Sequence, residues 1–130
     1  MPESKIPSPE TATRPVILIV DDNEFIRHVV AGTLRTGGYD VIEASDGRKA
    51  LAVVESGRNI DVVVTDVCMP NTNGFSLADS LRQREVPLPV IFVSAFEVDP
   101  SHVGPHATVL QKPFLPHQLL KKLTEICATL

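Results

Sequence analysis

Side chains that can bind ions or take part in reactions follow four short apolar runs of the sequence. These side chains are Asp21, Asp22, Asp66, Ser94 and Lys112. If the runs are parallel strands, their carboxyl ends meet at one edge of a sheet, where ligands bind in open α/β folds. The sequence therefore predicts one site that combines three carboxylates, a hydroxyl group and an ammonium group.

Three converging carboxylates repel one another, and this repulsion restricts what the site can be. At an effective dielectric constant of about 20, two unit charges about 4 Å apart repel by roughly 4 kcal/mol. The cluster therefore needs a counter-ion or shifted pKa values. A small site with few carboxylates, completed by water and phosphate oxygens, suits Mg²⁺. The cluster is thus of a kind that suits Mg²⁺, and Lys112 adds one fixed positive charge.

The same groups suit phosphoryl transfer. A carboxylate can act as a nucleophile and form an acyl phosphate. A metal ion, a lysine and a hydroxyl group then stabilise the charge on the transferring oxygens. Because Asp66 is ionised at neutral pH, the reaction needs no general base. Phosphoryl transfer to a carboxylate is the chemistry that the pattern indicates.

Two kinds of segment alternate along the chain, and they predict the fold that positions these groups. Runs that are apolar on both faces are typical of buried parallel strands, and they occur at 16–20, 41–42, 60–64, 90–93 and 109–110. Helical spacing is found from Asn23 to Gly37, from Asp46 to Gly57, after Gly74 and from Pro116. The alternation predicts an α/β fold, a doubly wound, five-stranded parallel sheet of the flavodoxin-like type in the order 2-1-3-4-5.

The apolar residues of the first and last predicted helices indicate which side of each packs on the sheet. One face of the first helix is expected to hold Ile26, Val29, Val30 and Leu34, and Ile26 could belong either to the core or to a docking surface. Cys127 lies on the apolar side of the last helix, so we expect it in the core rather than in a reactive site.

The composition is that of one compact domain. The chain has 130 residues, 43% of them hydrophobic, and a net charge of -4. Residues 1–14 are predicted to be a disordered tail, and 15–130 the domain. The lack of a basic block argues against direct nucleic-acid binding, and no apolar run reaches the roughly 18 residues of a membrane span. With no predicted secretion signal, we expect reduced cysteines and a cytoplasmic location.

Four segments of the sequence resemble the signature blocks of response-regulator receiver domains. The segments are ILIVDDNEFIR, VVVTDVCMPNTNGFSL, VIFVSA and LQKPF, and the resemblance covers residues 15–130. It implies that Asp66 is the phospho-acceptor and that Mg²⁺ is held by Asp21, Asp22, Asp66 and the backbone carbonyl of Cys68. It also implies that Ser94 and Lys112 bind the phosphoryl oxygens and that the Lys112–Pro113 peptide bond is cis.

The resemblance also implies a function and leaves alternatives open. The expected phosphodonor is a sensor histidine kinase or a histidine phosphotransfer protein, and the phosphorylated domain would switch contacts with a downstream protein. No turnover of an external substrate is expected. One alternative is an adaptor on the same fold that is never phosphorylated. An aspartyl-nucleophile phosphatase is disfavoured, because that class places its nucleophile in an Asp-x-Asp motif after the first strand.

Three features depart from the family's pattern, and one of them is Thr72-Asn73 before Gly74, where the family often has Met-Asp. The connection from Ala95 to Val109 is short and contains Pro100, Gly104 and Pro105, so the fourth helix is predicted to be reduced to a turn or lost. Val109 stands where the family usually has a Tyr or Phe whose rotamer changes on phosphorylation. We therefore expect the usual conformational switch to be altered while the chemistry stays intact.

Overall fold

The computed structural model describes residues 14–67, 74–83, 88–95 and 107–128. The strands of this part of the chain are β1 (Val16–Val20), β2 (Asp40–Ala44), β3 (Val62–Asp66), β4 (Val90–Ser94) and β5 (Ala107–Gln111). Its helices are α2 (Glu24–Thr36), α3 (Gly47–Glu55), α4 (Gly74–Arg82) and α5 (Pro116–Cys127). None of these helices is both long enough and apolar enough to cross a lipid bilayer.

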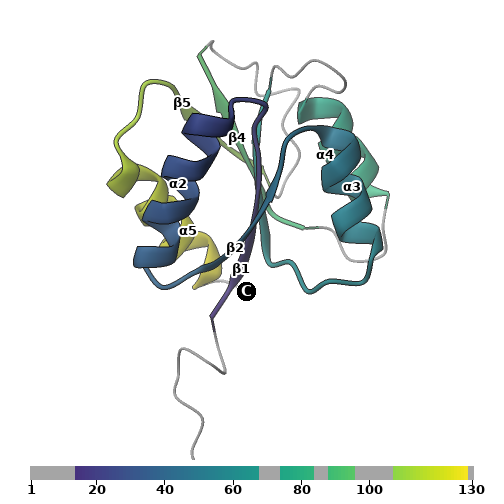
Figure 1. Ribbon diagram of the computed structural model, residues 1–130, viewed down its shortest axis with the longest axis horizontal. Coiled ribbons are helices and arrows are strands. Elements are labelled where there is room, and N and C mark those ends of the chain that lie inside the picture. The colour runs from purple at the N-terminus through teal and green to yellow at the C-terminus, as the bar shows by residue number, and fades with distance from the viewer. Residues whose placement is uncertain (1–13, 68–73, 84–87, 96–106, 129–130) are drawn as a thin grey trace, which may run out of the picture.

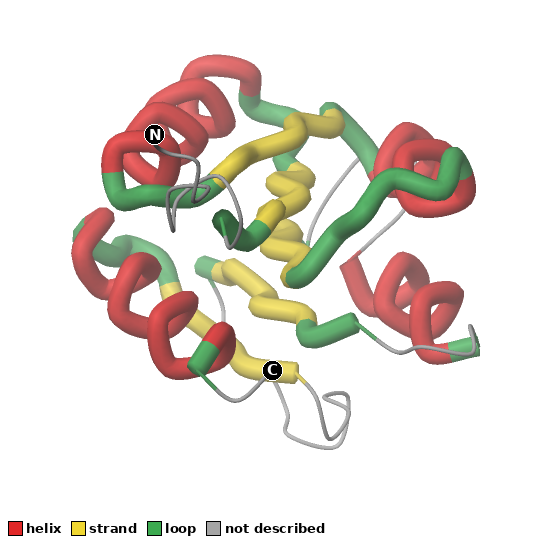
Figure 2. The backbone as a smooth tube through the Cα atoms, turned by 90° about the horizontal axis from the view of Figure 1, so that it is seen from below, coloured by secondary structure: helices red, strands yellow, loops and turns green. Residues whose placement is uncertain are grey.

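The five strands form one parallel sheet in the order β2-β1-β3-β4-β5, which confirms the predicted fold class. Helices α2 and α5 cover one face of the sheet, and α3 and α4 cover the other (Figure 1). Figure 2 shows the same three layers from below, with the strands between the two pairs of helices. Every strand therefore ends at the same edge, as the sequence analysis required.

The core consists of two apolar clusters, one on each side of the sheet. Alternate residues of a strand face opposite sides, so Leu18 and Phe92 pack with residues of α3 and α4. Their neighbours Ile17 and Ile91 join the cluster formed with α2 and α5. All four strand residues are fully buried. The central strands are thus held from both sides, which gives the site at their ends a rigid base.

Polar residues begin two of the helices at the predicted positions. The Asn23 side chain accepts a hydrogen bond from the Ile26 amide at 3.0 Å. The Asp46 carboxylate accepts one from the Lys49 amide at 2.8 Å. Each side chain satisfies a backbone donor that the helix itself leaves without a partner. At the carboxyl end of α3, Gly57 adopts a positive φ of 86°, a conformation that favours glycine.

The structure corrects two details of the sequence analysis. Strand β3 lies two residues later than the run 60–64. Asp61 comes just before it and bonds to Val16 twice: its amide donates to the Val16 carbonyl, and its carboxylate accepts from the Val16 amide, both at 2.8 Å. Ile26 and Val29 are not on the inward face of α2, since they are 39% and 49% exposed. Leu34 is fully buried there, as expected.

Three further expectations concern the termini and the loops. Residues 96–106, where a reduced fourth helix was predicted, lie outside the described residues, as do residues 1–13 of the predicted tail. Arg14 is described, and its side chain pairs with Asp40 at 2.9 Å. Within the described ranges there are four helices, and the fourth is at the carboxyl end of the chain. The Lys112–Pro113 bond is cis, as predicted.

Candidate functional site

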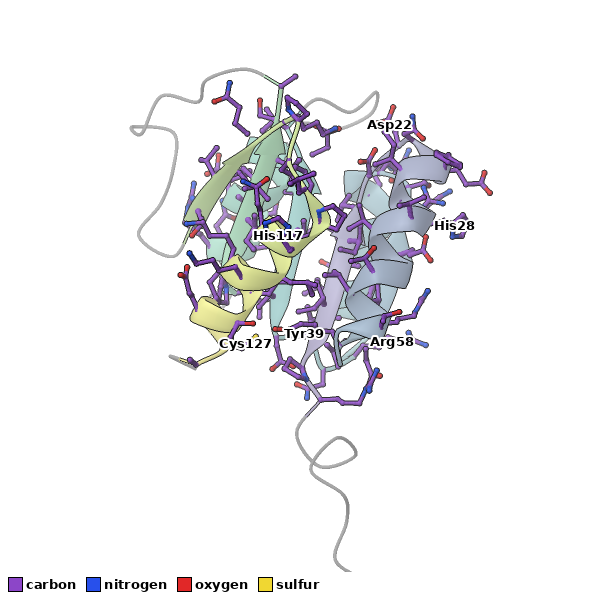
Figure 3. All side chains as sticks on the ribbon, turned by 90° about the vertical axis from the view of Figure 1, so that its left-hand side faces the viewer. Asp22, His28, Tyr39, Arg58, His117 and Cys127 are labelled. Carbon is purple, nitrogen blue, oxygen red and sulfur yellow. The ribbon has the colours of Figure 1, made fainter. Side chains whose placement is uncertain are left out.

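Three carboxylates meet at the carboxyl edge of the sheet. Asp21 and Asp22 follow β1, Asp66 ends β3, and one oxygen from each lies within 4.8 Å of the others. The pairing of Val20 with Thr65 explains this proximity, because the next residues of the two strands are then side by side. Asp22 marks this end of the molecule in Figure 3, opposite Tyr39.

Asp21 is the buried member of the cluster, with 8% of its surface exposed. Its amide donates to the Ala44 carbonyl at 3.2 Å, and its carboxylate accepts from the Asn23 amide at 2.9 Å. Burial raises the pKa of Asp21, and the negative charges of Asp66 and Asp22 raise it further, against the opposing effects of the Asn23 amide and Lys112. The surroundings of Asp21 therefore favour the protonated form of its side chain more than water does.

Lys112 brings a positive charge to Asp66. Its Nζ lies 3.2 Å from Asp66 Oδ2, and both side chains are largely buried. The Lys112 amide donates to the Ser94 carbonyl at 2.7 Å, which fixes the start of the β5–α5 connection against the end of β4. Ser94 is 2% exposed and directly follows Val93, the pairing partner of Asp66. The structure thus places Ser94 and Lys112 beside the candidate acceptor.

The donor set of the cluster fits Mg²⁺. Carboxylate oxygens are hard ligands, and a magnesium site uses only a few of them together with water and phosphate oxygens. Asp22 is exposed and Asp66 is partly buried, so solvent reaches the cluster from the Asp22 side. Burial raises the pKa of Asp21 most, and the charges of Asp66 and Asp22 raise it further; a bound cation would oppose both effects. Cys68, whose carbonyl was predicted as a further ligand, lies outside the described residues.

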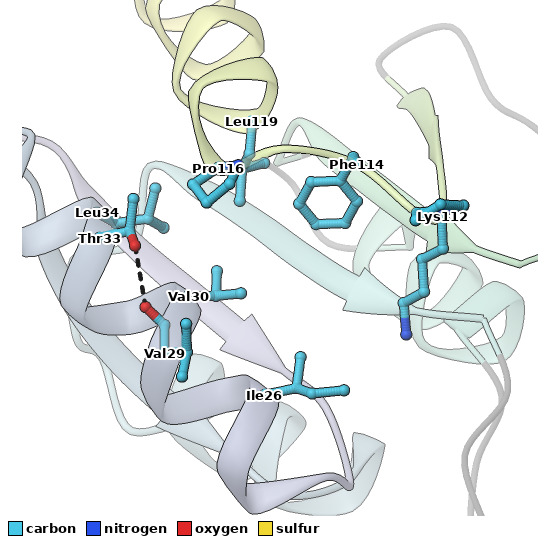
Figure 4. Close-up of a pocket in the computed structure, with 10 residues that line it drawn as sticks. Ile26, Val29, Val30, Thr33, Leu34, Lys112, Phe114, Pro116 and Leu119 are labelled. Atoms are coloured by element: carbon cyan, nitrogen blue, oxygen red, sulfur yellow. Dashed lines mark hydrogen bonds between the residues drawn. The ribbon is translucent and has the colours of Figure 1, made fainter.

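An apolar groove of about 300 Å³ lies between α2 and the amino end of α5. Figure 4 shows Ile26, Val29 and Val30 on one wall, facing Phe114 on the other, with Lys112 at one end. The α2 residues of the groove were expected on one apolar face of the first helix, with Ile26 open between the core and a docking surface. Their spacing predicted a wide apolar face, and the structure shows that the outer part of that face lines a groove instead of packing on the sheet.

The model of the response regulator receiver domain family matches residues 17–124 of this chain. The chain belongs to this family. Receiver domains are signalling modules of two-component systems and bind Mg²⁺ at an acidic pocket. A cluster of three aspartates, Asp21, Asp22 and Asp66, is present in this chain. The family and the fold were both predicted from the sequence, and both are confirmed.

Two curated relatives of this chain are longer proteins, and the chain matches only part of each. The chain is 40% identical over 98 residues to the sensor histidine kinase RcsC of Escherichia coli strain K12, covering 72% of this chain and 10% of that protein. It is 39% identical over 79 residues to the transcriptional regulatory protein PhoP of Bacillus subtilis, covering 61% and 32%. The chain thus spans a third or less of either relative's length.

Solved receiver structures agree with the fold along nearly their whole length. The chemotaxis response regulator CheY4 of Vibrio cholerae matches with a TM-score of 0.78 and 34% identity, covering 88% of this chain and 99% of that one. The receiver domain of the hybrid histidine kinase CckA matches with a TM-score of 0.76 and 34% identity, covering 86% and 98%.

Proposed function

We propose that Asp66 accepts a phosphoryl group from a phosphohistidine of a donor protein in a Mg²⁺-dependent reaction, and that the phosphoryl group then changes contacts with a downstream protein. One observation carries the proposal. Asp66 combines a 3.2 Å contact to Lys112 Nζ with a place in the cluster of three carboxylates. A nucleophile, a fixed cation and oxygen ligands for a metal ion therefore meet at one carboxylate.

Asp66 suits the role of acceptor better than its two neighbours. One oxygen of Asp21 already accepts the Asn23 amide, and the side chain is buried. Asp22 is exposed. Asp66 is half-buried and has the ammonium group beside it, so charge that develops on a transferring phosphoryl group is stabilised there without reorganisation of the site.

In the proposed reaction, an Asp66 oxygen forms a bond to phosphorus as the bond from phosphorus to the donor's imidazole nitrogen breaks. The electron pair of the broken bond stays on the imidazole, which takes up a proton. Lys112 remains paired with the negative charge, now that of the phosphoryl oxygens. Asp21, Asp22 and Asp66, with the Cys68 carbonyl expected from the family, would hold Mg²⁺, whose charge would offset the remaining repulsion.

The apolar groove supports docking of the phosphodonor on this face. It is continuous with Lys112, so a protein seated in it lies next to the acceptor. The relatives of this chain include receiver domains of sensor histidine kinases. We assign the groove to an apolar surface of the histidine-phosphorylated domain, either of a sensor kinase or of a histidine phosphotransfer protein. Exposed apolar side chains of this kind mark interaction sites.

The test is reaction with a small acyl phosphate and Mg²⁺, followed by intact mass. We expect one added phosphoryl group on the wild-type protein and on Asp40→Asn, an exposed acid at the other end of β2, but none on Asp66→Asn. Addition to Asp66→Asn would mean that the acceptor is another residue. No addition to wild-type protein that binds Mg²⁺, even with a phosphorylated histidine phosphotransfer protein, would favour the adaptor that is never phosphorylated.

Docking is tested separately from chemistry. Val29→Asp places a charge in the groove, away from the acidic cluster. We expect it to slow transfer from a phosphorylated histidine phosphotransfer protein about tenfold or more, because a charge must then be buried without a partner. The reaction of the same variant with the acyl phosphate should proceed at the wild-type rate. Equal rates from both donors would contradict the assignment of the groove.

A further inference from the structure

An ion pair between α2 and β2 also contacts the backbone of Asp21, the residue that follows β1. Arg27 of α2 donates through Nε to Glu43 Oε1 of β2 at 3.1 Å, and through Nη1 to the Asp21 carbonyl oxygen at 2.9 Å. Only 12% of the Arg27 side chain and 17% of the Glu43 side chain are exposed. One guanidinium group therefore joins a helix, an edge strand and the backbone of the candidate metal site.

Neighbouring residues of β2 hold Asp21 from both sides. The Asp21 amide donates to the Ala44 carbonyl. The Asp21 carbonyl is held by Arg27, which Glu43 in turn orients. The Asp21 backbone is thus held at both of its polar groups, and this fixes the point from which its carboxylate extends toward Asp66.

From this arrangement we infer that Arg27 and Glu43 are positioning residues for the metal site. They hold the backbone of Asp21, directly after β1, in the geometry that binds the cation. The inference rests on the proposed function, because it concerns the affinity for Mg²⁺. Repulsion among the three carboxylates would otherwise move Asp21 away from the other two. Loss of hydrogen bonds that hold metal ligands in place typically lowers metal affinity about 10–100-fold.

A role in positioning and a role through charge predict opposite effects. Arg27 is a cation near a cation-binding site, so loss of its charge alone would strengthen Mg²⁺ binding. Loss of its two hydrogen bonds would weaken Mg²⁺ binding, because the Asp21 carbonyl is then no longer held in place. Arg27→Lys keeps the charge but cannot present two donors in the fixed geometry of a guanidinium group. Weaker binding by this variant would be a signature of positioning.

Arg35 provides a matched control. Its Nη2 lies 3.7 Å from Glu43 Oε2 and donates to the Val41 carbonyl at 3.1 Å. It thus shares Glu43 with Arg27 on the same helix, but its hydrogen bond and its ion pair go to Val41 and Glu43, not to Asp21. Arg35→Gln removes a comparable charge and should leave Mg²⁺ affinity within about twofold of wild type, on the scale of exposed ion pairs.

The experiment is a calorimetric titration of metal-free protein with Mg²⁺, together with the unfolding temperature of the metal-free form. Arg27→Gln should bind Mg²⁺ about tenfold more weakly. Arg27→Lys and Glu43→Gln should also weaken binding, and the double substitution Arg27→Gln, Glu43→Gln should add little to Arg27→Gln alone, because both remove one connected network. If Arg27→Gln does not fold, Arg27→Lys decides the question, because it keeps the positive charge.

Three results would overturn the inference. They are unchanged or tighter Mg²⁺ binding by folded Arg27 variants, an equal loss in Arg35→Gln, and a lower unfolding temperature without any loss of affinity, which would indicate a purely structural pair. In these cases the wild-type protein still binds Mg²⁺, and the proposed function stands. If the wild-type protein binds no Mg²⁺, the proposed function fails, and the inference fails with it.

Discussion

Removal of the Asp21 charge should stabilise the metal-free protein. The three ligand oxygens of the cluster lie within 4.8 Å of one another, so each pair of full charges repels by roughly 3 kcal/mol at an effective dielectric constant of about 20. Asp21→Asn removes two of the three pairs and the cost of burying a charge, while the amide oxygen can still accept the Asn23 N–H bond.

Other effects reduce this gain. Asp22 is exposed, so water and salt screen its repulsion of Asp21. The substitution also removes the attraction between the Asp21 carboxylate and Lys112. In the wild-type protein this attraction lowers the pKa of Asp21. We therefore expect Asp21→Asn to raise the free energy of unfolding by about 1 to 3 kcal/mol, well below the sum of the pairwise repulsions.

The assay is urea unfolding followed by circular dichroism, with chelator and with Mg²⁺. In chelator, Asp21→Asn should shift the midpoint to higher urea with an unchanged slope. Mg²⁺ should stabilise the wild-type protein by binding the native state, and should have little effect on the variant. Asp40→Asn is the control: its carboxylate pairs with Arg14 on the surface, so the change should be at most about 1 kcal/mol, and destabilising.

The pH dependence has a definite sign. The pKa of Asp21 is raised in the native state, so between the unfolded and native pKa values the native protein binds more protons. The contribution of Asp21 to metal-free stability therefore falls as pH rises through this window. Comparison of wild type with Asp21→Asn isolates it, and the advantage of the variant should grow over the same window. A variant less stable than wild type in chelator at neutral pH would refute the reasoning about repulsion.

Three other substitutions test separate parts of the structure. Lys112→Met should slow phosphorylation by an acyl phosphate, measured by intact mass, and leave Asp66 as the acceptor, because the ammonium group that pairs with it is lost. Phe92→Ala, in the buried core, should lower the unfolding free energy in urea by about 3–5 kcal/mol. Asp46→Ala should lower it by about 1 kcal/mol, since the bond to the Lys49 amide is lost.

The sequence predicted the acidic site well because the site depends on local order along the chain. Each reactive residue follows a strand, and parallel strands end at one edge. The register then brings Asp21 next to Asp66. The helix starts at Asn23 and Asp46 were predictable for a similar reason, since each cap involves a backbone amide only three residues away.

Features that depend on distant parts of the chain were not predictable in the same way. Glu43 and Arg27 are 16 residues apart, and no local pattern marks them as partners. Ile26 and Val29 have the spacing of a core face. Whether such residues are covered depends on where α5 packs, and the 3.6-residue period carries no information about the neighbouring helix.

The groove and the acceptor share residues, and this limits how docking can be separated from chemistry. Ile26, Phe114 and Lys112 line the groove, and the same three line a smaller cavity that reaches Asp66. A substitution at any of them therefore alters the surroundings of the acceptor as well as the docking surface. Val29 lines the groove but not the cavity at Asp66. For this reason a defect of Val29→Asp that is confined to the protein donor would identify the groove as its docking surface, whereas a defect at Lys112 or Phe114 would not.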